Sequence, residues 1–90
     1  MPKTTITATA PDSSIQFTRK TDRSYTHAVL VKLPEGHHGA WAQGRHYEGG
    51  QWMPFSWCGR LDLARAQLSR AVEVFGQAAR SEIVSVEAAA

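Results

Sequence analysis

The strongest constraint on the fold is one stretch with helical periodicity, residues 61–79. Apolar residues recur there at intervals of three and four, which places them on one face of a helix. They are Leu61, Ala64, Leu68, Ala71, Val72, Phe75 and Ala79. Asp62 stands at the start of the stretch, where a carboxylate can cap free N–H groups. A helix with one apolar face must pack on another layer, which the rest of the chain has to supply.

The other segments are expected to form strands, either because their side chains alternate between two faces or because a turn signal joins them. They are residues 15–20, 24–33, 40–48, 51–58 and 82–87. Residues 24–33 are apolar on both faces in the middle, which predicts a central strand. Residues 21–23 predict the turn of a first hairpin, and Gly49-Gly50 predicts the turn of a second. Pro54 has no N–H, so residues 51–58 are expected to form an edge strand or to contain a bulge.

These elements predict an α+β fold. Its antiparallel sheet has four to five strands, made of two hairpins plus a C-terminal strand, and the amphipathic helix packs on one face. Residues 15–87 are expected to form a single domain. Residues 1–14 form either a flexible segment or an edge strand, and residues 88–90 a frayed tail. The second sheet face then stays in water, is covered by the loop at residues 34–50, or meets a partner.

Composition and charge exclude several classes of protein. The chain has 90 residues, of which 42% are hydrophobic and 20% charged, as in ordinary globular domains. Its net charge of +2 is too small to indicate a nucleic-acid partner. The single Cys58 cannot form an internal disulfide. No apolar run approaches the roughly 20 residues that span a bilayer, so we expect no membrane partner and a cytoplasmic protein.

Two groups of residues are candidates for binding. Arg19, Lys20 and Arg23 surround the first turn and could hold phosphate or an acidic protein surface, although they could equally be a solvated turn. The second group, near the loop and the second turn, comprises Trp41, Arg45, Tyr47 and Trp52. Aromatic and arginine side chains dominate binding hot spots, and they also stack on unpaired bases. Phe55 and Trp57 are expected instead to fill the core beneath the helix.

Motifs for catalysis or metal binding are weak. His37, His38, His46 and Cys58 lack the paired spacing of zinc ligands, so we expect no metal and no cofactor. Cys58 could form a nucleophile–base–orienter set with His27 or His46 and Asp62. No catalytic signature surrounds it, so the sequence favours a protein that is not an enzyme.

The layout of strands, one Ala-rich helix and a closing strand resembles small accessory proteins of phages and prophages. The segments at residues 19–28 and 55–64 carry this resemblance, and the group includes anti-CRISPR proteins. The resemblance implies a non-enzymatic inhibitor, monomeric or homodimeric, that works in the host cytoplasm. It would dock on a host protein or protein–RNA complex and block it. Because the chain is slightly basic, mimicry of DNA is not expected.

Two alternatives remain open at this point. The first is a small nucleic-acid-binding module that uses the basic turn and exposed aromatic side chains. The second is a structural subunit that pairs with other copies through an open sheet edge.

Overall fold

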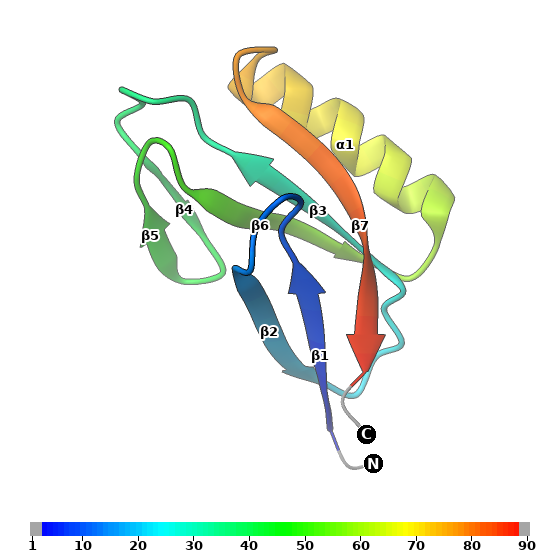
Figure 1. The fold of residues 1–90 in the computed structure, drawn as a ribbon. Coiled ribbons are helices and arrows are strands. Elements are labelled where there is room, and N and C mark those ends of the chain that lie inside the picture. Colours follow the sequence, from blue (N-terminus) through cyan, green and yellow to red (C-terminus); the bar gives the residue numbers. More distant parts are fainter. Residues whose placement is uncertain (1–2, 89–90) are drawn as a thin grey trace.

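Residues 3–88, which the computed structural model describes, form seven strands and one helix (Figure 1). The first three strands are β1 (Thr4–Thr9), β2 (Gln16–Thr21) and β3 (His27–Lys32). The short strands β4 (Ala40–Ala42) and β5 (Arg45–Tyr47) precede β6 (Trp52–Cys58), α1 (Leu61–Phe75) and β7 (Arg80–Ala88). The predicted α+β class is confirmed: one helix packs on an antiparallel sheet of five strands, beside a small sheet of two.

The five-stranded sheet has the order β2-β1-β7-β3-β6, and every neighbouring pair is antiparallel. β3 lies between β7 and β6, as expected of a central strand. β7 pairs with β3 through residues 80–85 and then with β1 through residues 86–88. The first hairpin was therefore predicted wrongly. β2 pairs with β1 rather than with β3, because both edges of β3 are already occupied by β6 and β7.

The helix lies close to the sheet because small residues form its inner face. Ala64 and Ala71 are completely buried, and α1 contacts β3, β6 and β7. The helix ends at Phe75 rather than at Ala79, and Gly76 follows it as the C-cap. Gly76 has a φ of +78°, and its N–H donates a 2.8 Å hydrogen bond to the carbonyl of Val72. A residue in this left-handed region cannot continue a right-handed helix.

The expected cap at the start of the helix was wrong. Arg60 occupies the N-cap position and makes no side-chain capping bond, while Asp62 lies in the first turn. The two side chains form an exposed ion pair, with Nε of Arg60 3.2 Å from Oδ1 of Asp62. The carboxylate still lies near the positive end of the helix dipole, which is favourable without a capping bond.

Two apolar clusters lie on opposite faces of the sheet. The cluster beneath the helix includes Val29, Val31 and Met53. The second cluster joins residues of β1 to residues of β3 and β6, and comprises Ile6, Ala8, Ala10, Ala28, Leu30, Trp52 and Trp57. The second face is therefore covered by β1 of the same chain. Covering by β1 was not among the outcomes expected for that face.

The ends of the described chain take part in this arrangement. β1 is an internal strand between β2 and β7, rather than the edge strand or flexible segment expected of residues 1–14. Ala88, expected to begin a frayed tail, is the last residue of β7 and pairs with Ile6. Residues 1–2 and 89–90 of those two predictions lie outside the described residues.

A β-bulge in β6 determines which face its side chains occupy. Val29 pairs with Ser56 and Leu30 pairs with Pro54, so Phe55 has no residue opposite it. An extra residue reverses the alternation beyond it. Phe55 packs on the helix-side cluster as expected, but Trp57 belongs to the opposite cluster. The prediction from Pro54 is confirmed, since β6 is both an edge strand and bulged.

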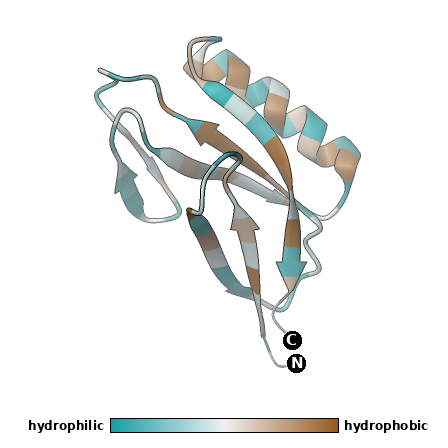
Figure 2. Ribbon diagram, viewed as in Figure 1, coloured by the Kyte–Doolittle hydropathy of each residue, from teal (hydrophilic) through white to brown (hydrophobic). Residues whose placement is uncertain are grey.

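The second hairpin was also predicted wrongly. Residues 40–48 are not one strand, because Gln43 and Gly44 have φ values of +53° and +78° and form a tight turn between β4 and β5. Positive φ at both central residues is typical of the type I′ turn, whose twist matches that of a hairpin. β4 and β5 pair with each other and stand beside β6 (Figure 1). Figure 2 shows β5 as hydrophilic and the end of β3 as hydrophobic.

Candidate binding groove

A groove lies between the edge strand β2, the β4–β5 hairpin and β6. Its larger part has a volume of about 390 Å³, and an adjoining hollow of about 150 Å³ extends it. The larger part is lined by Gln16, Phe17, Thr18, Arg19, Gln43, Arg45, Tyr47, Pro54 and Trp57. The smaller hollow shares four of these residues and adds Ile15, Gln51 and Trp52. We call the two parts together the β2 groove.

Aromatic side chains form the floor of the β2 groove. The rings of Phe17 and Tyr47 meet edge to face, with centroids 6.1 Å apart. Tyr47 and Trp57 are each only 8% exposed. Phe17 is half-buried and packs against both apolar clusters. The floor is therefore anchored in the core and offers a fixed surface.

Two arginines supply the charge of the groove. The guanidinium of Arg19 lies 5.2 Å from the centre of the Tyr25 ring, and that of Arg45 lies 5.5 Å from the centre of the Tyr47 ring. Within residues 3–88 the ion pairs join Arg60 to Asp62 and Arg80 to Asp12 and Glu82, so neither groove arginine takes part in one. The lining residues include no carboxylate. The arrangement favours an anionic group near both arginines.

The structure brings together some of the predicted binding residues and separates others. Arg19, Arg45, Tyr47 and Trp52 all line the β2 groove. Tyr47 and Trp52 are buried, however, so they are not the surface aromatics that the sequence suggested. Their burial follows from contacts with β2 and β1, which the sequence pattern does not reveal.

Trp41 is the exposed aromatic of the predicted group. Its side chain is 73% exposed, and its ring lies 5.3 Å from that of His46 on the neighbouring strand. Trp41 and His46 are paired across β4 and β5, so the hairpin carries them side by side. Trp41 does not line the groove.

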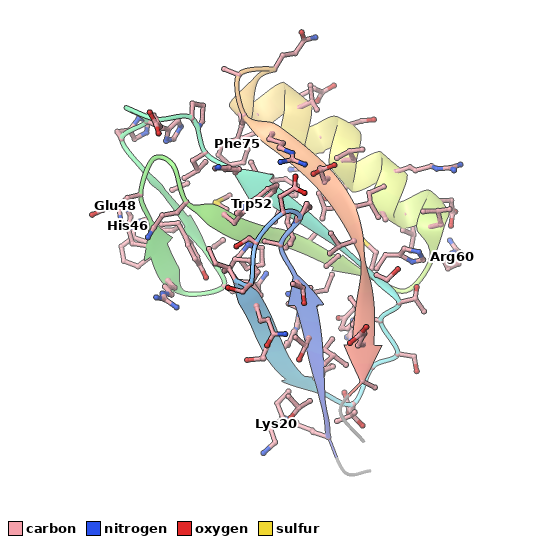
Figure 3. The ribbon with its side chains drawn as sticks, in the orientation of Figure 1. Lys20, His46, Glu48, Trp52, Arg60 and Phe75 are labelled. Carbon is pink, nitrogen blue, oxygen red and sulfur yellow. The ribbon has the colours of Figure 1, made fainter. Side chains whose placement is uncertain are left out.

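The three residues of the predicted basic turn do not all line the groove. Lys20 and Arg23 are exposed and do not line the groove, whereas Arg19 does. Figure 3 shows Lys20 at the far end of β2 from Trp52 and His46. The turn is held by Thr21, whose Oγ1 accepts a 3.1 Å hydrogen bond from the backbone N–H of Arg23.

Trp52 is covered by Arg80 from β7. The guanidinium lies 5.5 Å from the indole centre, and Arg80 also pairs with Asp12 at 3.0 Å and with Glu82 at 2.7 Å. The hydrogen bond to Asp12 raises the pKa of Arg80 above its usual value. Arg80 therefore holds the β1–β2 turn over the indole and is not available to a ligand in the groove.

The histidines and the cysteine lie outside the groove. His37 stacks on His38 with centroids 4.5 Å apart, and its Nδ1 accepts a hydrogen bond from the N–H of Gly39. Cys58 is buried opposite His27 in the sheet register, but His27 Nδ1 bonds to Thr26 Oγ1. Over residues 3–88 no three His, Cys, Asp or Glu side chains are grouped so that they could hold a metal ion.

Several lining residues were not predicted. Gln16, Phe17 and Thr18 belong to a predicted strand, but strand periodicity does not say that its edge borders a groove. Gln43 lies in the unrecognised turn, where Asn-Gly or Asp-Gly would have been a clearer signal. Pro54 and Trp57 reach the groove because of the bulge between them.

Comparisons with known proteins gave no match, whether with protein-family models, with curated proteins or with solved structures. In the described part of the chain, α1 is neither long nor apolar enough to cross a lipid bilayer.

Proposed function

We propose that this protein is a non-catalytic binding protein that docks on an acidic region of a partner protein through the β2 groove. The observation that carries the proposal is the pair Arg19 and Arg45, which form no ion pair within residues 3–88 and line a groove without carboxylates. The proposal includes the role that the resemblance to phage accessory proteins implies. The protein would occlude part of a host protein or protein–RNA complex.

A protein partner is favoured over free nucleic acid because two aromatic side chains of the groove, Tyr47 and Trp52, are buried. Binding of single strands needs exposed ring faces on which bases stack. Tyr47 and Trp52 are 8% and 5% exposed, so their faces are already covered by the protein itself. Lys20 and Arg23 lie apart from the groove and do not extend its charge along a phosphate backbone.

A capture experiment with matched charge variants tests the proposal. The groove variant is Arg19→Glu/Arg45→Glu, and the control is Arg65→Glu/Arg70→Glu on exposed helix positions, which changes the net charge equally. Wild-type protein and both variants are used to capture partners from a nuclease-treated bacterial lysate. We expect proteins that bind wild type and control but not the groove variant. Equal recovery by the groove variant would contradict the proposal.

A titration of labelled single- and double-stranded oligonucleotides distinguishes the nucleic-acid alternative. We expect weak binding, with a Kd above about 10 μM near physiological salt. Binding to phosphates would weaken steeply with salt because counterions are released. Submicromolar binding with a steep salt dependence, lost in the groove variant, would favour a nucleic-acid-binding function instead.

A further inference from the structure

The free backbone groups of β2 can be assigned from the sheet register. β2 pairs with β1 in a regular register of six residue pairs, and within the described chain it has no neighbour on its other side. The carbonyl of Ile15 accepts a 2.9 Å hydrogen bond from the N–H of Ala10, so Ile15 faces β1. Backbone groups alternate along an antiparallel strand. The N–H and C=O groups of Gln16, Thr18 and Lys20 therefore point away from β1.

The β2 groove follows this free edge. Its lining includes five consecutive residues of the β2 region, from Ile15 to Arg19. Side chains of successive residues point to opposite faces, so a hollow on one face would touch only alternate residues. All five of these residues line the groove, so the groove lies along the free edge of β2 rather than over one of its faces. Five residues of extended chain span about 16 Å, which suits a short extended segment.

We infer that the groove binds an extended acidic segment of the partner protein, which adds as a strand to the free edge of β2. This inference rests on the function proposed above and specifies how the partner is held. The outward N–H and C=O groups of Gln16, Thr18 and Lys20 supply the backbone hydrogen bonds. Carboxylates of the segment meet Arg19 on β2 and Arg45 across the groove.

The position of Arg19 on β2 favours acidic side chains on one face of the added strand. Arg19 pairs with Ile6 and Phe17 pairs with Ala8, so Arg19 and Phe17 share one face of the sheet. A segment with acidic residues at every second position places all of its carboxylates on one face. Directly opposed unlike charges stabilise paired strands. The segment therefore binds best when its acidic face lies on the side of Arg19.

Two other modes of strand pairing are disfavoured. β6 is also an edge strand, but Pro54 has no N–H and the bulge at Phe55 interrupts its regular pairing. Pairing of β2 with β2 of a second copy would bring together strands that each carry Arg19 and Lys20 and no acidic residue. Like charges on paired strands repel each other.

Binding of a labelled acidic peptide tests the inference, and methylated forms of the peptide test whether its backbone hydrogen bonds are needed. The probes are a fluorescent eight-residue peptide of alternating glutamate and threonine and two methylated forms of it. One form is N-methylated at the glutamates and the other at the threonines, so each lacks half of the N–H donors. Thr18→Pro removes an outward N–H of β2 without removing a bond to β1, whereas Thr18→Ala keeps that N–H. We expect the unmethylated peptide to bind wild type and Thr18→Ala. Methylation on the edge-facing residues, or Thr18→Pro, should weaken binding by about tenfold or more.

Each outcome has a separate meaning. The two methylated peptides test the need for backbone hydrogen bonds even if Thr18→Pro fails to fold. Equal binding of the unmethylated peptide and both methylated peptides would overturn strand addition, while the lysate experiment would still decide the proposed function. No binding of the acidic peptide up to about 1 mM would also overturn the inference. Binding that persists in Arg19→Glu/Arg45→Glu would overturn the assignment of the acidic face.

Discussion

The rings of Phe17 and Tyr47 meet edge to face with centroids 6.1 Å apart, and this contact joins the edge strand β2 to the β4–β5 hairpin. Tyr47 belongs to the helix-side cluster, and Phe17 packs against the clusters on both sides of the sheet. The floor of the β2 groove is therefore continuous with the core. Damage to the floor should be measurable as lost stability.

We expect Tyr47→Ala to lower the free energy of unfolding by about 3–5 kcal/mol, because a buried aromatic ring is lost. Tyr47→Phe keeps the ring and its contact with Phe17, and should stay close to wild type. Urea denaturation of the three proteins measures the difference. Equal midpoints for Tyr47→Ala and wild type would show that the ring does not support the fold.

The bulge in β6 leads to a second prediction. Deletion of Phe55 should leave a folded protein, because the pairs Leu30–Pro54 and Val29–Ser56 become consecutive and every other residue of β6 keeps its face of the sheet. Phe55→Ala keeps the bulge and loses only a half-buried side chain whose ring lies 6.0 Å from that of Phe75. Near-UV circular dichroism and thermal melting compare the two variants. A deletion variant that fails to fold while Phe55→Ala folds would contradict this account of the register.

The end of the helix gives a third prediction, which depends on the backbone alone. Gly76 has a φ of +78° and a ψ of 177°, a conformation that residues other than glycine rarely adopt. A Cβ added there would have nothing within 4 Å, so no steric contact obscures the effect. Gly76→Ala should cost about 1–3 kcal/mol of stability. The matched substitution Gln77→Ala, at the next exposed position, should be nearly neutral.

The close approach of the helix to the sheet gives a fourth prediction. Ala71 is completely buried on the inner face of the helix, whereas Ala66 on the same helix is exposed. Ala71→Leu should destabilise the protein by about 1–3 kcal/mol because the core has no room for the larger side chain. Ala66→Leu introduces the same residue into the same helix without that conflict. Similar melting temperatures for the two variants would indicate that the helix can shift outward.

Local features of the chain could be predicted because their causes are local. The apolar spacing that begins at Leu61 predicts a helix whatever it packs against, although Gly76 ends that helix before Ala79. The absent N–H of Pro54 restricts β6 to an edge or a bulge. The apolar faces of residues 24–33 likewise required a buried strand, since both had to be covered. These properties depend on sterics, hydrogen-bonding groups and periodicity within a few residues.

The partners of each strand were decided only by the tertiary structure. Periodicity shows that a face is apolar but not which other face it meets, so the sequence did not reveal that β1 covers Trp52 and Trp57. A single extra residue at Phe55 moved Trp57 to the opposite face, because every side chain beyond a bulge changes sides. Arg19 and Arg45 were both predicted as binding residues. Only the folding of the chain brings them to one groove, since contacts between distant segments depend on how the whole sheet is ordered.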